Sequence, residues 1–286
     1  MRYIIFTCLL LLHCLYAEAQ LYVPGETLNY RMSYKAALFP NTEVAKVTIN
    51  TSEATLDGRA AYKVYGIGQT SRAFNWIFPV KDIYTIWVDR SSLRTKRFES
   101  DLKEGDYTRK STFIFDQDNG KVYTSWRTRQ RPMKYCTMDI SQQGMDAVSL
   151  YFNLRSVDES ELHDGYTRTL ELVMEDTVRY LNLRYEGREV KRIRNLGRFN
   201  TLKFRCKIAT SDGYAFTDGT EFEIWISDDR NKIPLYIQSP IKVGSVQAYL
   251  SSYEGWGFTC ASSRSSSPTA VTWACIPPRL KYTESI

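Results

Sequence analysis

The chain has 286 residues, of which 24% are charged and 43% hydrophobic, and its formal net charge is +6. This mild positive balance is not the concentrated basic charge that marks nucleic-acid-binding proteins, so we expect no nucleic-acid partner. The chain has only two histidines, which excludes metal sites built from several histidine ligands. We expect neither a metal nor a cofactor.

The N-terminal segment has the pattern of a secretory signal peptide. One positive charge precedes an apolar core from Ile4 to Leu15, and Ala17-Glu18-Ala19 matches the small-x-small cleavage pattern. The apolar core is shorter than the roughly 20 residues that span a bilayer. The pattern therefore predicts that residues 1–19 are removed and that the mature protein is periplasmic or secreted.

A lipid anchor on Cys14 is the alternative to free export. The residues before it, Leu-Leu-His at 11–13, lack the small residue expected at a lipoprotein cleavage site. Free export is therefore favoured. No later segment is apolar enough to cross a membrane, so no transmembrane segment is expected after the signal is removed.

Four cysteines follow the signal peptide, and four cysteines allow three disulfide pairings that the sequence does not distinguish. The C-x-x-C spacing of zinc knuckles and redox pairs does not occur among them. We expect buried thiols or at most one structural disulfide among Cys136, Cys206, Cys260 and Cys275.

Short strands separated by turns are predicted along the first part of the chain. A strand over Leu28–Leu38 is followed by a hairpin that joins Val44–Ser52 to Ala60–Ile67 through Leu56-Asp57-Gly58. A single helical turn is predicted over Ser71–Phe78, just before a proline.

A second hairpin and one helix are predicted in the middle of the chain. Tyr107–Phe115 and Lys121–Trp126 flank Asn119-Gly120, a pair typical of type I′ turns because both central residues need positive φ. Apolar residues at helical spacing predict a helix over Met145–Arg155. Further strands are predicted over 81–89, 93–102, 167–175, 181–190, 202–209, 221–226 and 246–252.

Several strands are apolar on both faces, which indicates that each face is covered. In Ile83–Val88, Ile83 and Trp87 lie on one face and Tyr84, Ile86 and Val88 on the other. We therefore expect an all-β fold, a curved and incompletely closed antiparallel β-barrel with one or two short helices and an occupied interior. It forms a single domain over residues 20–255. The Ser- and Pro-rich stretch 256–286 is interpreted as a disordered tail or the product of a frameshift.

Several segments, in this order and spacing, are similar to a known family: Pro24-Gly25-Glu26, Trp76-x-Phe78-Pro79-Val80, Trp87-Val88-Asp89, Asp146–Phe152, Trp225–Asp229 and Gly244–Leu250. Together they resemble, over residues 22–255, the exported bacterial family known as domain of unknown function 3108. The resemblance implies a β-rich envelope protein of Gram-negative bacteria without an assigned activity, and a looser similarity to the open β-barrel of outer-membrane lipoprotein carriers. It implies no catalytic residues.

Residues for catalysis are scarce. The single histidine after the signal, His163, lies in a polar turn, and no Gly-x-Ser-x-Gly elbow supplies a nucleophile. Glu221 and Glu223 share a strand face with Trp225 and could form a hydrolase carboxylate pair, but such alternation is usually the wet face of a strand. We expect no catalytic residues and no enzyme.

Gly66-x-Gly68 lacks the third glycine of a dinucleotide fingerprint and is interpreted as a pair placed where a strand bends or ends. Arg127, Arg129 and Arg131 alternate at period two and could hold an anionic head group, although a solvated surface is the more ordinary interpretation.

Aromatic residues cluster around Pro79 and supply the candidate ligand-binding site. Trp76, Phe78, Tyr84 and Trp87, with Phe152 from the helix, either line an apolar cavity or form the core. We expect a non-enzymatic envelope protein that binds a lipid, glycolipid or other amphiphile in the barrel. The alternatives are a fully packed barrel that binds an envelope protein partner and, behind it, the carboxylate-dependent hydrolase.

Overall fold

A computed structural model describes residues 21–36, 39–208, 221–241 and 244–255. The predicted signal peptide (1–19), the predicted tail (256–286), Cys260 and Cys275 lie outside the described residues.

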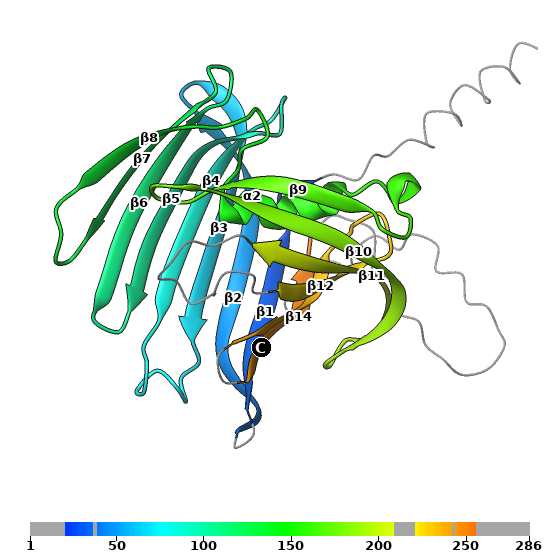
Figure 1. The fold of residues 1–286 in the computed structure, drawn as a ribbon. Coiled ribbons are helices and arrows are strands. Elements are labelled where there is room, and N and C mark those ends of the chain that lie inside the picture. Colours follow the sequence, from blue (N-terminus) through cyan, green and yellow to red (C-terminus); the bar gives the residue numbers. More distant parts are fainter. Residues whose placement is uncertain (1–20, 37–38, 209–220, 242–243, 256–286) are drawn as a thin grey trace, which may run out of the picture.

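Fourteen strands form one antiparallel sheet that curls around a short helix (Figure 1). The helical segments are α2 (Ala147–Asn153) and two short 3₁₀ turns, η1 (Leu154–Ser156) and η2 (Glu159–Glu161). The strands are β1 (Thr27–Ala36), β2 (Phe39–Leu56), β3 (Arg59–Thr70), β4 (Lys81–Asp89), β5 (Thr95–Glu104), β6 (Tyr107–Asp116), β7 (Lys121–Thr128), β8 (Lys134–Asp139), β9 (Thr167–Val173), β10 (Val178–Ile193), β11 (Gly197–Ile208), β12 (Glu221–Ser227), β13 (Pro234–Pro240) and β14 (Ser245–Glu254).

Nearly every strand pairs with its neighbours in sequence. The order is β8-β7-β6-β5-β4-β3-β2-β1-β14-β13-β12-β11-β10-β9, so the two ends of the meander meet at the β1–β14 pair in the middle of the sheet. The two edges are β8 and β9, and backbone pairing does not join them. The expected curved, incompletely closed antiparallel barrel is confirmed, with its opening at the point where the helix is inserted.

Side chains bridge this opening. The hydroxyl of Thr124 on β7 donates to the backbone carbonyl of Glu175, which lies in the turn after β9. The guanidinium of Arg109 on β6 lies 2.8 Å from the Glu175 carboxylate. The β6–β7 part of the sheet is therefore tied to the β9–β10 hairpin without a continuous strand ladder.

The two predicted hairpins form with different turns. Asp57 and Gly58 both have positive φ (50° and 77°), so the β2–β3 connection is the two-residue turn that Asp-Gly favours. In the β6–β7 connection Asp116 pairs with Lys121, and of Asn119 and Gly120 only Gly120 has positive φ (65°). The type I′ turn predicted at Asn119-Gly120 is wrong, because four residues rather than two close that hairpin.

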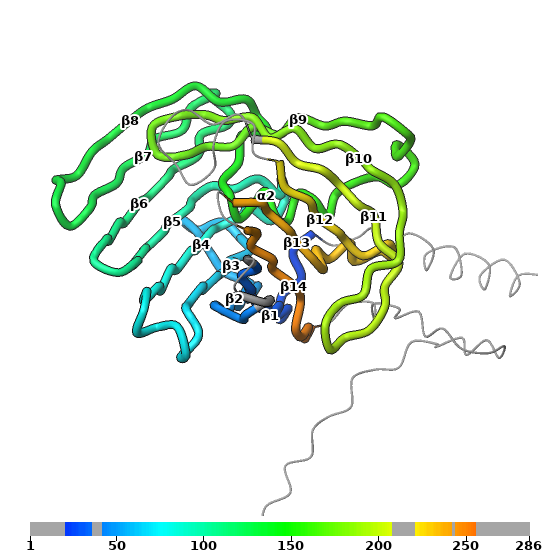
Figure 2. The backbone as a smooth tube through the Cα atoms, turned by 60° about the horizontal axis from the view of Figure 1, so that its bottom comes forward, coloured from blue at the N-terminus to red at the C-terminus, as the bar shows by residue number. Residues whose placement is uncertain are grey.

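The helix α2 lies inside the ring of strands (Figure 2). Its side chain Phe152 is fully buried and stacks on Tyr22 with ring centroids 4.7 Å apart. One apolar cluster packs on the inner faces of β3–β7, a second on β9–β12, and a third around β1, β13 and β14. The helix contributes side chains to all three, so it fills much of the barrel.

Both faces of β4 were expected to be covered, and on the outer face the cover consists of neighbouring side chains. Ile86 and Val88 point inward and are fully buried. Trp87 points outward, and the cationic groups of Lys63 and Arg97 lie 5.4 and 5.6 Å from its ring centroid. Neighbouring long side chains rather than a second layer therefore shield the outward apolar residues, as cation–π contacts allow.

Candidate functional site

An apolar cavity of about 600 Å³ lies on the inner side of β1–β4, against α2. The strands supply most of its wall and the β3–β4 loop supplies one side. Apolar side chains from strands and helix dominate the lining, among them Met32, Val44, Val47, Ile49, Val80 and Val148.

Two glycines on the inward face of β3 make room for the cavity. Gly66 and Gly68 are separated by one residue and so face the same side of the strand. A Cβ added at Gly68 would lie 3.7 Å from Val47 Cγ2, and one at Gly66 would lie 4.0 Å from Tyr84 Cβ, both ordinary contacts. The hollow therefore exists because these positions carry no side chain. Both lie within β3, so of the two interpretations, a strand bend or a strand end, the strand end does not apply.

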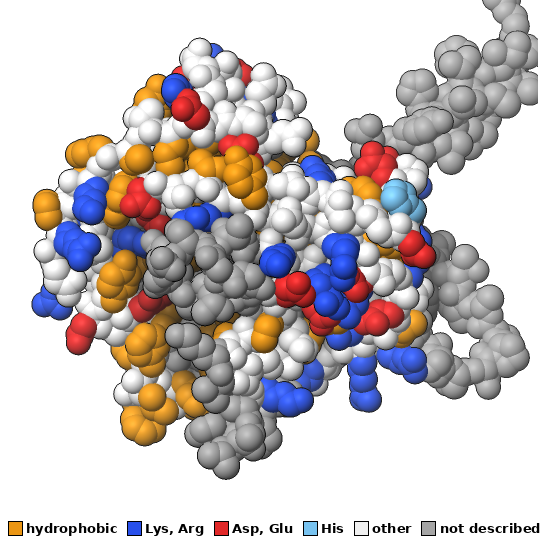
Figure 3. Space-filling view, viewed as in Figure 1, with side chains coloured by type: hydrophobic (Ala, Val, Ile, Leu, Met, Phe, Trp, Pro, Cys, Tyr) orange, Lys and Arg blue, Asp and Glu red, His pale blue; other side chains and the backbone are white. Residues whose placement is uncertain are grey.

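The β3–β4 loop supplies Phe74, Ile77 and Phe78 to the cavity. Thr70 holds the base of this loop, because its hydroxyl donates to the Phe78 carbonyl (3.0 Å) and accepts from the Val80 N–H (2.8 Å). The loop contains the helical turn predicted there, because the Asn75 N–H donates to the Ser71 carbonyl (3.0 Å) and the Phe78 N–H to the Phe74 carbonyl (3.1 Å), although these turns do not join into a regular helix. Apolar side chains are exposed at its tip, where Trp76 is 81% accessible (Figure 3).

The helix that closes the cavity begins at a buried carboxylate. Asp146 is fully buried, and its Oδ1 accepts from the N–H groups of Val148 (2.8 Å) and Ser149 (2.9 Å). Its Oδ2 accepts from the hydroxyls of Ser149 (2.6 Å) and Thr95 (2.9 Å). Asp146 therefore caps the helix and fixes it to β5. Burial raises the pKa of this carboxyl, and the hydrogen bonds oppose the shift.

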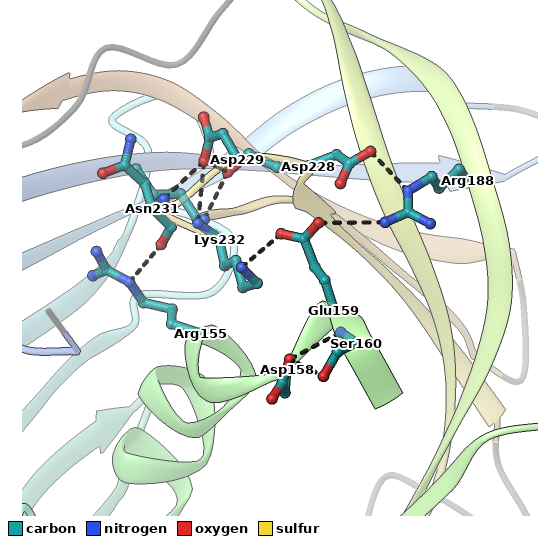
Figure 4. A network of polar contacts seen from close by, with 11 residues as sticks. Arg155, Asp158, Glu159, Ser160, Arg188, Asp228, Asp229, Asn231 and Lys232 are labelled. Carbon is teal, nitrogen blue, oxygen red and sulfur yellow. Dashed lines mark hydrogen bonds and ion pairs between the residues drawn. The ribbon is translucent and has the colours of Figure 1, made fainter. Parts of the chain in front are cut away.

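The other end of the helical segment is held by a buried ion pair. Arg155 lies 2.7 Å from Glu26, with side chains 2% and 1% accessible, and its Nε donates to the Asn231 carbonyl (3.0 Å). Outside this pair, Glu159 contacts both Lys232 (2.9 Å) and Arg188 (3.3 Å) (Figure 4). This network fixes the helix against β10 and the β12–β13 turn.

Asp82 is the only charged residue among the described residues that line the cavity. Its Oδ1 accepts from the Lys103 N–H (3.1 Å), and burial is the main cause that raises its pKa. Beside it, burial raises the pKa of Tyr84 to about 12. The wall is thus apolar with one partly buried acid.

The predicted ligand residues separate into three groups. Phe78 and Tyr84 line the cavity. Trp76 is exposed on the loop and Trp87 faces outward, while Phe152 is fully buried in the core. The aromatic cluster therefore contributes two of its five members. The glycine pair was the signal that sequence reasoning passed over, since two glycines at period two remove volume from one strand face.

The arginines of the predicted anion site lie around the end of β7. A polar hollow of about 350 Å³ there is lined by Arg109, Arg127, Arg131 and Lys134 but not by Arg129. Because β7 ends at Thr128, the alternation of one strand face does not extend to residues 129 and 131.

The predicted hydrolase carboxylates each face a cation. Glu223 lies 2.7 Å from Lys203 and Glu221 lies 3.3 Å from Arg205, all on adjacent strands. Figure 3 shows such mixed charges over β10 and β11. His163 is exposed, and its Nδ1 lies 3.0 Å from the Asp164 carbonyl. These groups do not converge on a common cavity.

Within the described ranges, no group of three or more His, Cys, Asp or Glu side chains could hold a metal ion. The part of the chain that the structure describes also has no helix with the length and apolarity needed to cross a membrane. Of the two described cysteines, neither Cys136 nor the buried Cys206 forms a disulfide, and burial raises the pKa of the Cys206 thiol to about 12.

The fold places the chain among β-barrel-like proteins. It is similar to the crystal structure of a beta-barrel-like protein of domain of unknown function DUF1849 from Brucella abortus, with a TM-score of 0.55 and 10% identity over 82% of this chain and 99% of that one. A protein from Parabacteroides distasonis described as a "putative lipoprotein" matches with a TM-score of 0.36 and 8% identity over 84% of this chain and 100% of that one.

The chain belongs to the family described as protein of unknown function (DUF3108), whose pattern matches residues 29–251. The predicted family is confirmed. No curated protein sequence matches the chain. Neither the family nor these structural neighbours carries an enzymatic description.

Proposed function

We propose that this protein is an exported, non-enzymatic envelope protein that binds an amphiphilic ligand in the cavity between β1–β4 and α2. The observation that carries this proposal is the glycine pair at 66 and 68, which leaves room for an apolar hollow between the strands and α2. Ligand sites of a few hundred Å³ with mainly apolar walls are typical of small-molecule binding. The predicted signal peptide at residues 1–19 supports export.

Gly68→Leu tests this proposal directly. Neither glycine has positive φ and a Cβ at 68 makes only an ordinary contact, so the leucine side chain extends into the cavity without backbone strain. We expect native mass spectrometry of the wild-type protein, purified from its own periplasm, to show an adduct of lipid mass that denaturation removes. The variant should lose that adduct and keep its fold.

Trp87→Leu is the matched control, because it removes an aromatic side chain from the outer face of the neighbouring strand. It should keep the adduct. A wild-type protein that carries no adduct, or a Gly68→Leu protein that keeps it, would count against ligand binding in this cavity.

A second candidate function, binding an envelope protein through the sheet edge, has its own observation. Tyr135 on the edge strand β8 is 79% accessible, and Tyr123 on the neighbouring strand is 46% accessible. Exposed aromatic residues beside an unpaired edge are typical of interaction surfaces. The cationic side chains of the polar hollow at Arg127 and Arg131 would then bind an anionic group of the partner.

A further inference from the structure

The polar residues of the cavity wall indicate which head group the ligand carries. Asp82 contributes the only charge among the described lining residues, and the other polar side chains of the lining, Gln69, Thr70, Tyr84 and Tyr151, are uncharged. An anionic head group, such as a fatty-acid carboxylate, therefore meets no cation on the described wall. It would instead approach a partly buried carboxylate.

Most of the charges behind the wall have the same sign as Asp82. Those that act on the Tyr84 hydroxyl come from the carboxylates of Asp82, Glu104 and Glu175 and from one guanidinium, that of Arg109. Arg109 is already paired with Glu175 at 2.8 Å. The part of the cavity around Asp82 and Tyr84 therefore has a net negative environment.

We propose that the cavity selects an amphiphile with a non-anionic head group that donates hydrogen bonds, either an ammonium or a hydroxyl group, to the Asp82 carboxylate. The inference rests on the proposed function and specifies its ligand class. Asp82 has room for this contact, because the Lys103 N–H is the one donor that reaches it from the described part of the chain, and it occupies only Oδ1.

The test is displacement of the neutral fluorophore N-phenyl-1-naphthylamine from the full mature protein at neutral pH. The three competitors are dodecylamine, monolauroylglycerol and lauric acid, which share one chain length and are used below their micelle concentrations. We expect the amine to displace the fluorophore at a concentration roughly tenfold lower than the acid, with the glyceride between them.

Asp82→Asn keeps an oxygen that accepts the Lys103 N–H and removes the charge, so it should fold and bring the amine and the acid to within about threefold. Asp106→Asn is the matched control, since Asp106 is exposed in the neighbouring β5–β6 turn and does not line the cavity. It should leave the ranking unchanged. Circular dichroism checks that both variants are folded.

Equal or tighter binding of lauric acid to the wild-type protein would overturn the head-group inference while leaving the cavity as a binding site. An Asp82→Asn protein with an unchanged ranking would also overturn it. If no amphiphile displaces the fluorophore, the proposed function itself fails and the inference falls with it.

Discussion

At the scale of single residues, Asp146 shows how a buried carboxylate is kept in an apolar barrel. It has no accessible surface, and its two oxygens accept four hydrogen bonds from the helix start and from Thr95. These bonds reduce the cost of burial but do not cancel it, because the pKa of the carboxyl is still raised. The residue combines a helix cap with an attachment to the sheet.

The raised pKa of Asp146 predicts a pH dependence of stability. The folded protein holds this proton more tightly than the unfolded chain, whose Asp pKa is about 3.9, so this residue's contribution to the free energy of unfolding falls as pH rises above about 4. In Asp146→Asn the contribution does not titrate. We therefore expect the free energy of unfolding of the wild-type protein minus that of Asp146→Asn to decrease between about pH 3 and pH 7, as measured by urea unfolding.

Asp158→Asn is the control for this prediction. Asp158 caps η2 by accepting hydrogen bonds from Ser160, and these bonds lower the pKa of its carboxyl. The free energy of unfolding of the wild-type protein minus that of Asp158→Asn should therefore increase with pH. A difference for Asp146→Asn that is flat or increases with pH would contradict the assignment of burial as the dominant cause.

At the scale of elements, the helical segment is held at both ends. The Asp146 cap fixes its start to β5, and the Glu26–Arg155 pair fixes its end to the chain just before β1. Between them, the hydroxyl of Tyr151 lies 2.5 Å from that of Tyr30, which donates to the Pro234 carbonyl (2.8 Å). The helix is therefore a fixed part of the barrel, and the cavity wall it provides is rigid.

Removing one partner of the buried ion pair should lower the free energy of unfolding strongly, and removing both partners should lower it much less. Arg155→Met leaves the Glu26 carboxylate buried without its counter-charge and should lower the free energy of unfolding by about 3–5 kcal/mol. The double variant Glu26→Gln, Arg155→Met should recover at least about half of that loss in a double-mutant cycle by urea unfolding.

The exposed pair Arg90–Glu53, 3.1 Å apart with side chains 50% and 60% accessible, gives the comparison. Its removal should cost less than about 1 kcal/mol. Additive losses in the Glu26 and Arg155 variants would show that the buried pair does not couple the helix to β1.

Elements with a clear local signal could be predicted from the sequence. The range Lys81–Asp89 matches β4, because its alternation and β-branched residues act locally. Two strands were missed. β8 is an exposed edge without apolar alternation, and β13 is bounded by Pro234 and Pro240, which argue against a strand in local terms.

The candidate site could be predicted only in part, since it depends on which face of each strand is concave. Phe78 and Tyr84 were found through their aromatic character. Gly66 and Gly68 line a cavity only because β3 curves around α2, and this curvature of the sheet has no short-range sequence signal here. Trp87 was grouped with Tyr84 as a ligand residue although the two lie on opposite faces of β4, because alternation alone does not say which face is inside.

At the scale of the whole molecule, the described fold ends with β14. β14 pairs with β1 on one side and β13 on the other, so it belongs to the middle of the sheet. We propose that residues 256–286 are not part of this domain. A protein truncated after Gly255 should therefore have a thermal midpoint within about 2 °C of the full chain by differential scanning calorimetry.

Truncation before Ser245, which also removes β14, is the control. It would turn β1 and β13 into edges and expose two central strands, so the product should aggregate or fail to fold. A large loss of stability on removing only residues 256–286 would show that the domain extends beyond Gly255.

The β1–β14 pair also sets the order in which the barrel can be completed. Asn29 on β1 bonds to Ser252 on β14 across 223 residues, and closing such a loop costs about 5 kcal/mol of chain entropy. The local hairpins can form as soon as the chain emerges, whereas one edge of β1 waits for the last strand. While the chain is being made, that edge stays unpaired for nearly the whole length of the domain. The slow step of folding and the main exposure to misassociation therefore both fall on the β1–β14 pair.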